Sequence, residues 1–167
     1  MKKIILSAIM LMGLTFAAQA QDISKNALGL RLGGNNGFGG EISYQRALAT
    51  DNRLELDLGW RNRSNYNNNG YDDRAIKLTG LYQWVWNIDG GFNWYAGVGG
   101  GVGSYSYDDN NTSYNDTFAF AAGDIGLEYN FDFPLLISLD FRPEFGGNGY
   151  YKNNYGSDVA LGLRYQF

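Results

Sequence analysis

The sequence predicts an all-β fold, a closed antiparallel up-and-down barrel of eight strands. After residue 20, apolar and polar residues alternate with period 2 in eight separate runs of about 8 to 12 residues each. No stretch in that part of the chain shows the 3.6-residue period of an amphipathic helix. The connectors between the runs alternate between short and long, as expected for strands that run up and down around a barrel.

The first 20 residues have the pattern of a secretory signal peptide. Two lysines form the positive start, an apolar stretch follows, and Ala18-Gln19-Ala20 forms a small-residue cleavage site. A membrane anchor is the alternative, but the apolar stretch of about 14 residues is shorter than the roughly 20 that cross a bilayer as a helix. We therefore expect residues 1–20 to be a signal peptide and residues 21–167 to form one barrel domain.

Each later run places large apolar side chains on one face and charged or small residues on the other. We expect strands near 27–34, 38–48, 53–61, 74–86, 92–105, 117–131, 135–145 and 158–167. In chain order, the apolar face carries Leu28, Leu30 and Leu32, then Ile42 and Tyr44, then Leu54, Leu56, Leu58 and Trp60, then Ile76, Leu78, Tyr82 and Trp84, then Ile125, Leu127 and Tyr129, then Ile137, Leu139 and Phe141, and finally Val159, Leu161, Leu163, Tyr165 and Phe167. The fifth run is instead marked on its other face by Gly97, Gly99, Gly101 and Gly103.

The connectors are expected to differ between the two ends of the barrel. Short connectors are expected at 49–52, 87–91 and 132–134, and long ones at 62–73, 106–116 and 146–157. The long connectors consist mainly of Asn, Asp, Gly and Tyr, which favour turns and solvent. Only the first connector, at 34–37, is short although it belongs to the long side.

The side-chain volumes on the two faces predict which face lies outside. Eight strands enclose only enough room to be filled by side chains, so the large apolar face does not fit inside. The polar face combines glycines with long charged residues, which can interdigitate across a narrow lumen. We therefore expect a transmembrane β-barrel, with a soluble lipocalin-like barrel as the less favoured alternative. Its membrane girdle would consist of Trp60, Trp84, Trp86, Trp94, Phe131, Phe133 and Tyr165.

The chain resembles the small eight-stranded outer-membrane barrels typified by OmpX and the membrane domain of OmpA. The resemblance covers about residues 22–167 and rests on the signal peptide, the eight alternating strands, the unequal connectors and the final strand. That strand ends in Phe167 with Tyr165 two positions before it, similar to the assembly signal of that family. The resemblance implies the outer membrane, contact with its lipid and with the barrel-assembly machinery, periplasmic termini and long loops outside the cell.

Charged residues on the expected lumen face are nearly balanced. Six are basic and eight acidic, namely Arg31, Arg53, Arg61, Lys77, Arg142 and Arg164 against Glu41, Glu55, Asp57, Asp124, Glu128, Asp140, Glu144 and Asp158. An unpaired charge in a water-poor lumen would be costly, so we expect a lumen charge network of ion pairs. A narrow ion pathway is the alternative. The glycines at 97–103 would leave either a water pocket or room for Arg or Lys from facing strands.

The composition excludes most catalytic, metal and nucleic-acid functions. The chain has neither Cys nor His, which removes thiol nucleophiles, imidazole bases and zinc clusters, and the enzymes known on such barrels depend on His. The glycine run at 97–103 lacks the spacing of a nucleotide loop. Without its two signal-peptide lysines, the chain has 11 basic and 17 acidic side chains, a net charge of −6, which argues against nucleic acid. We expect no enzyme, no cofactor and no metal.

The long connectors are the best candidates for a functional surface. The segments 66–73, 105–111 and 150–155 mix Tyr with Asn and Asp, a composition that suits recognition of a protein or glycan. Asp72, Asp73, Asp108 and Asp109 lack the spacing of a calcium loop. Solvated loops also need polar, turn-forming residues, so the composition alone does not require a ligand. We expect a structural or surface-interaction role, with a small ion- or water-conducting pore as the alternative.

Overall fold

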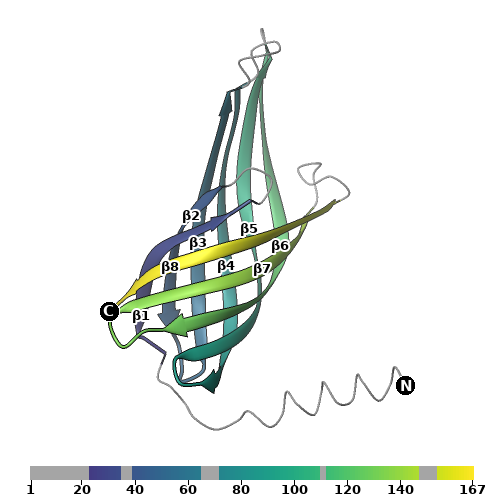
Figure 1. The fold of residues 1–167 in the computed structure, drawn as a ribbon. Coiled ribbons are helices and arrows are strands. Elements are labelled where there is room, and N and C mark those ends of the chain that lie inside the picture. Colours follow the sequence, from purple (N-terminus) through teal and green to yellow (C-terminus); the bar gives the residue numbers. More distant parts are fainter. Residues whose placement is uncertain (1–22, 35–38, 65–71, 110–111, 147–153) are drawn as a thin grey trace, which may run out of the picture.

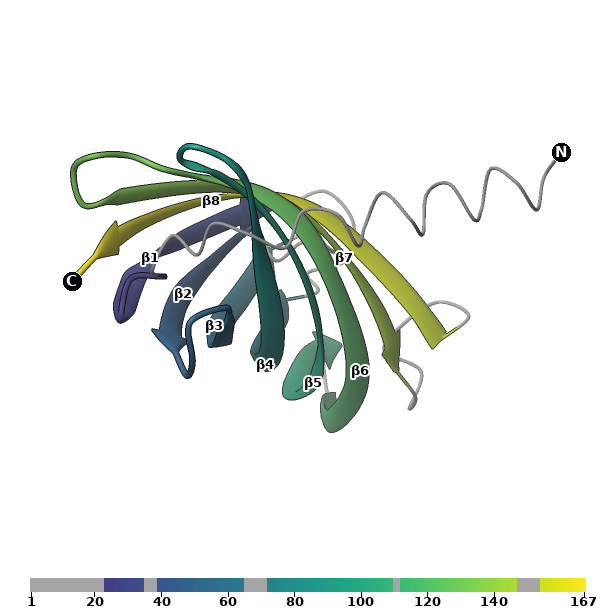
Figure 2. The same cartoon turned by 90° about the horizontal axis from the view of Figure 1, so that it is seen from below.

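The computed structural model describes residues 23–34, 39–64, 72–109, 112–146 and 154–167. Eight antiparallel strands pair in chain order and close into one barrel, which confirms the predicted fold class (Figures 1 and 2). The strands are β1 (Asn26–Gly33), β2 (Gly40–Ala47), β3 (Asn52–Ser64), β4 (Asp72–Asp89), β5 (Phe92–Asp109), β6 (Thr112–Asn130), β7 (Leu135–Gly146) and β8 (Tyr155–Gln166). The predicted signal peptide at 1–20 lies outside the described residues.

The barrel closes where the first strand pairs with the last. Leu30 lies opposite Leu163, and this antiparallel register continues along β1 and β8. At the end of the seam, the N–H of Asn26 donates to the carbonyl of Phe167 at 3.1 Å, and the N–H of Phe167 donates back at 2.9 Å. The C-terminal strand is therefore bonded on both edges, and within the described strands no edge of the closed region is left unpaired.

Burial alternates along every strand in step with the sequence pattern. Along β8, Ala160 and Arg164 are 1% exposed, whereas Leu161 and Leu163 are 49% exposed. Most of the leucines, isoleucines and aromatic rings of the other strands likewise face outward, whereas Leu81, Tyr95, Phe118, Phe120 and Leu136 are buried. The described interior thus differs from the apolar calyx of a soluble ligand-binding barrel. In the part of the chain described, no helix has the length and apolar character needed to cross a membrane.

The three central strands are much longer than the others. β4 and β5 each have 18 residues and β6 has 19, whereas β1 and β2 have 8 each. These long strands extend well beyond the rest of the barrel, at the end away from the C-terminus (Figure 1). The short turns lie at the opposite end, where Gly90 adopts a φ of 51° and its carbonyl accepts a hydrogen bond from the Asn87 amide at 2.9 Å.

One predicted connector is wrong over most of its length. The segment 106–116 was expected to be a long loop, but β5 continues to Asp109 and β6 begins at Thr112. The pairing of Tyr105 with Asp116 is extended one residue at a time until Asp109 meets Thr112. Tyr and Thr favour strands, and continuing an aligned pair of strands adds hydrogen bonds at each step, which outweighs the turn preference of Ser, Asn and Asp.

Candidate functional site

The charged residues predicted for the lumen lie inside the barrel. Thirteen of the fourteen are 5% exposed or less, namely Arg31, Glu41, Arg53, Glu55, Asp57, Lys77, Asp124, Glu128, Asp140, Arg142, Glu144, Asp158 and Arg164. Arg61 is half-buried, nearer the loop end of β3. Each buried charge belongs to a strand whose outward neighbours are apolar, so strand parity alone directs it into the lumen.

Arg31 of β1 joins the first and last strands to their neighbours. Its Nη1 lies 2.8 Å from Asp158 Oδ2 of β8 and 3.2 Å from Glu41 Oε2 of β2. The same guanidinium also donates to the Asp140 carboxylate of β7, through both Nε and Nη2. Asp158 in turn accepts a hydrogen bond at 2.8 Å from the N–H of Gly34, just after β1 ends. Three carboxylates around one cation thus hold the closing seam.

Arg142 of β7 spans the lumen to strands on the far side of the barrel. Its Nη2 lies 2.6 Å from Asp57 Oδ2 and 2.9 Å from Glu55 Oε1, both on β3. Its Nη1 lies 3.2 Å from Glu41 Oε2, the oxygen that Arg31 also contacts. In a closed barrel of eight strands, β3 and β7 lie opposite each other, so these contacts cross the lumen.

Glu55 is the most connected carboxylate of the network. Besides Arg142, it accepts from Arg164 Nη2 at 3.2 Å and from the Gln45 side-chain amide at 2.6 Å. Arg164 also donates to the hydroxyls of Ser43 at 2.9 Å and Ser138 at 2.8 Å. The strong desolvation cost of burying Glu55 and Arg164 is therefore offset by several charge-assisted hydrogen bonds rather than by one pair.

Gln83 of β4 links this cluster to the short-turn half of the lumen. Its amide nitrogen donates to Glu55 Oε2 at 3.2 Å and also to the Asp124 carboxylate, while its oxygen accepts from Arg53 Nε at 2.6 Å. Arg53 forms an ion pair with Glu128 at 2.7 Å. Glu128 also accepts a hydrogen bond from the Asn93 amide at 3.3 Å. These contacts bring β5 and β6 into the network.

Lys77 of β4 connects the network toward the loop end. Its Nζ lies 2.9 Å from Glu144 Oε1 and 3.2 Å from Glu41 Oε1. With these contacts, the described ion pairs and hydrogen bonds form one continuous network that reaches all eight strands. Such an arrangement holds the wall together from within and fills the lumen with paired charges.

Apolar side chains inside the barrel were not predicted. Phe118 and Phe120 of β6 are 2% and 6% exposed and form an apolar cluster with Leu81 and Ala122. Strand parity would have located both rings, because residues 118 and 120 share the face of Asp124 and Glu128. The charged residues on the same face of this strand favour a polar lumen, so the sequence pattern does not single out the two rings.

The glycines of β5 make room for these rings. A Cβ on Gly103 would lie 2.3 Å from Phe118 Cζ, and one on Gly101 would lie 2.5 Å from Phe120 Cζ. The two expectations for these glycines, a water pocket or space for Arg or Lys from facing strands, are therefore wrong at both positions. Lys77 Nζ does lie near this cluster, 5.6 Å from the centre of the Phe120 ring, where it forms a cation–π contact.

Of the seven predicted girdle residues, six lie near the short turns and Trp60 lies toward the other end of β3. Trp86 and Trp94 face each other across the β4–β5 turn and stack with 4.3 Å between ring centroids. Aromatic contacts continue through Tyr129, Phe131 and Phe133 at the next short turn. The remaining predicted girdle residues, Trp60, Trp84 and Tyr165, all have exposed rings. The predicted assembly residues Tyr165 and Phe167 lie on the outward face of the C-terminal strand, 60% and 62% exposed.

The predicted loop surface is only partly described. Residues 66–71, 110–111 and 150–153 lie outside the described residues. The acidic residues 72, 73, 108 and 109 lie in paired strands, where Asp72 is opposite Asp108. Among the residues described, no group of acidic side chains is arranged to hold a metal ion.

Comparison with known proteins identifies the architecture. No family model matches the chain, and no curated protein matches it in sequence. The chain is similar in structure to Neisserial surface protein A, with a TM-score of 0.63, 16% identity, and coverage of 85% of this chain and 94% of the other. It is also similar to Ail, the attachment invasion locus protein of Yersinia pestis, with a TM-score of 0.59, 16% identity and coverage of 86% and 97%.

Two further matches extend this comparison. The N-terminal β-barrel domain of Pseudomonas aeruginosa OprF matches with a TM-score of 0.59, 15% identity, and coverage of 87% of this chain and 100% of that domain. Ail also matches in its complex with the heparin analogue sucrose octasulfate. The predicted resemblance to small eight-stranded outer-membrane barrels is thus confirmed at the level of the fold.

Proposed function

We propose that this protein is an integral outer-membrane barrel whose long strands and loops contact molecules at the cell surface. The observation that carries the proposal is the inverted distribution of side chains, with exposed Leu, Ile and aromatic residues outside and paired charges inside. In water this arrangement would expose a large apolar belt, whereas in a bilayer the same belt faces lipid. The fold shared with outer-membrane barrels supports the same location.

The surface role rests on the length of β4, β5 and β6. A strand tilted in a bilayer needs about 9 to 11 residues to cross it. These strands have 18 or 19, so roughly half of each extends beyond the apolar band. Because the long strands project away from the end with the C-terminus, we propose that they face the exterior and that both termini face the periplasm (Figure 1).

The charge of the projecting region favours a protein or an uncharged glycan as its partner. Ail has been crystallised with a sulfated sugar, which is an anionic ligand. In this chain the projecting strands and loops carry five acidic residues against three basic ones, a net charge of −2, together with Asn and Tyr; these are Asp72, Asp73, Asp108, Asp109 and Asp116 against Arg63, Arg74 and Lys152. Carboxylates would repel a sulfated polymer, whereas amides and aromatic rings suit hydrogen bonding and stacking.

A binding screen on the reconstituted barrel tests this role. The barrel in lipid nanodiscs would be presented to panels of uncharged glycans, sulfated glycans and extracellular proteins, beside a variant in which residues 65–71 are replaced by a short Gly-Ser turn. A matched control carries Asp132→Ser at a short turn on the opposite end. We expect binding that the loop replacement removes and the control retains. Binding confined to sulfated glycans, or unchanged by the loop replacement, would contradict the proposal.

A further inference from the structure

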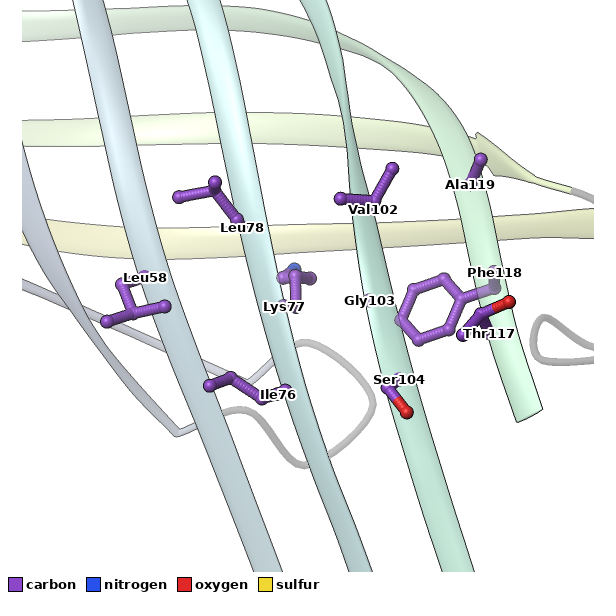
Figure 3. A pocket seen from close by; sticks show the side chains of 10 residues that line it. All are labelled: Leu58, Ile76, Lys77, Leu78, Val102, Gly103, Ser104, Thr117, Phe118 and Ala119. Carbon is purple, nitrogen blue, oxygen red and sulfur yellow. The ribbon is translucent and has the colours of Figure 1, made fainter. Parts of the chain in front are cut away.

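We propose that a groove on the outer wall of the barrel binds one acyl chain of an anionic glycolipid of the lipid A class. The groove has a volume of about 490 Å³ and crosses β3, β4, β5 and β6 (Figure 3). Its outward-facing lining consists of Leu58, Ile76, Leu78, Val102 and Ala119, with Ser104 and Thr117 at one end. The inference rests on the membrane location proposed above.

Small residues create the hollow. Leu58, Leu78, Val102 and Ala119 lie side by side in register on four successive strands, so side-chain size falls from β3 to β6 along this row. The floor of the groove is backbone, because Lys77 and Phe118 direct their side chains into the lumen and Gly103 has none. The Phe118 ring fills the space behind Gly103 on the lumen side, so the groove does not open into the lumen.

The groove changes from apolar to polar along its length. One row closer to the ends of the long strands, Ile76 is in register with Ser104 and Thr117. In the next row, Arg74 is in register with Ser106 and Asn115, and the Arg74 side chain is exposed. The apolar row would contact the acyl chain of a phosphorylated glycolipid, the row of hydroxyls its sugar, and the Arg74 guanidinium its phosphate. A guanidinium suits this last contact because it binds phosphate oxygens in a bidentate manner.

The position of the groove favours lipid A over a phospholipid. Its polar end points toward the ends of the long strands, which face the exterior in the proposed orientation. An acyl chain in the groove would then belong to the outer leaflet, whose lipid in a Gram-negative outer membrane is lipopolysaccharide. Among lipid tails the hydrophobic effect gives no preference, so selectivity would come from the fit of the chain and from the polar end.

The test compares two substitutions on the same strand and the same face. Val102→Trp fills the groove, whereas Val98→Trp places the same ring outside it, and the two valines are 59% and 57% exposed. The barrel would be titrated with purified lipid A in detergent, and bound lipid would be counted by native mass spectrometry. We expect Val102→Trp to reduce lipid A occupancy about fivefold and Val98→Trp to leave it unchanged, since only the former removes the chain contacts.

A second substitution tests the polar end. Arg74→Gln should weaken binding of phosphorylated lipid A about threefold, the loss of one exposed charge-assisted contact, and should not affect dephosphorylated lipid A. Equal occupancy in both tryptophan variants, equal binding of phospholipid, or dimers of the barrel in place of bound lipid would overturn the inference. A barrel that inserts into bilayers but binds no lipid A refutes only this inference, whereas failure to insert refutes the membrane location as well.

Discussion

Arg142 on β7 and Glu55 on β3 meet across the lumen, with 2.9 Å between Nη2 and Oε1. The two strands lie on opposite sides of the barrel, so this pair connects walls that share no backbone hydrogen bond. Arg31, Arg164 and Lys77 extend the connection to β1, β2, β4 and β8 through shared carboxylates. The lumen is thus the charged core of the protein, in the place where a soluble barrel would have an apolar one.

Removing the central cation should destabilise the barrel strongly. Arg142→Met leaves Glu41, Glu55 and Asp57 buried with one cation fewer, and we expect a loss of about 3 to 5 kcal/mol in the free energy of unfolding. Urea unfolding in lipid vesicles, followed by tryptophan fluorescence, measures this loss. The exposed Arg74→Met is the matched control, with an expected loss below about 1 kcal/mol. Similar losses for both substitutions would show that the lumen pairs contribute little.

The partners of Arg142 should be coupled to it energetically. Glu55→Gln removes a carboxylate that also serves Arg164 and Gln45, so alone it should be destabilising too. The losses of the two single variants should add up to more than the loss measured for the double variant, because each single change already breaks the same contact. A double-mutant cycle in the same unfolding assay measures the coupling, and strict additivity would contradict a direct interaction.

The contact between Gly103 and Phe118 gives a steric prediction. Gly103→Ala would place a methyl group 2.3 Å from Phe118 Cζ, and we expect it to destabilise the barrel by about 1 to 3 kcal/mol. Adding Phe118→Leu should recover part of this loss by removing the ring. Gly80→Ala is the control, because its methyl group would meet only Leu56 Cδ2, at 3.5 Å. If both alanines cost the same, the packing described for the lumen is incorrect.

The ion-paired lumen predicts a barrel that does not conduct. Side chains of Arg142, Glu55, Lys77 and Phe120 cross or fill the interior, and opening a path would require breaking several buried contacts at once. We expect planar bilayers containing the purified protein to show no reproducible conductance steps. Regular steps that disappear when the protein is omitted would favour the pore alternative.

The C-terminal residue should control assembly more than stability. Phe167 is 62% exposed, and its ring adds little to the packing within the barrel. Phe167→Ala should therefore lower the amount of protein in the outer membrane several-fold while leaving the unfolding of the purified barrel nearly unchanged. Immunoblots of membrane fractions, with Gln166→Ala as control, measure the effect. Equal membrane levels in the two variants would contradict the proposed assembly signal.

Most of the fold was predictable because successive side chains of a β-strand point to opposite faces. Once Leu161 and Leu163 are placed outside, period 2 directs Ala160, Gly162 and Arg164 inside. The strand ends were less predictable, since Asn and Asp at 108–111 favour a turn locally, whereas the paired neighbours extend the strands. Local propensity competes there with pairing energy, which a single sequence does not display.

The charged lumen residues were also predictable, but their pairing was not. The alternation along the strand predicts that Arg142 faces the lumen. Which of the eight carboxylates it contacts depends on the tilt of the strands and the register of the barrel. The interior rings of Phe118 and Phe120 were missed for a different reason. An apolar ring inside a mostly polar lumen contradicts the average pattern, and only the glycines opposite it on the neighbouring strand indicate the available space.

The central claim is that this chain spans the outer membrane with its long strands outside, and cysteine labelling tests it most directly. The sequence contains no cysteine, so single substitutions provide unambiguous sites. Asn115→Cys lies on the projecting part of β6, and Asp132→Cys lies at a short turn at the opposite end. With a bulky maleimide that does not cross membranes, we expect intact cells to label position 115 alone, and position 132 to react only after the outer membrane is permeabilised. Labelling of both positions on intact cells, of position 132 alone, or recovery of the protein in the soluble fraction would contradict the claim.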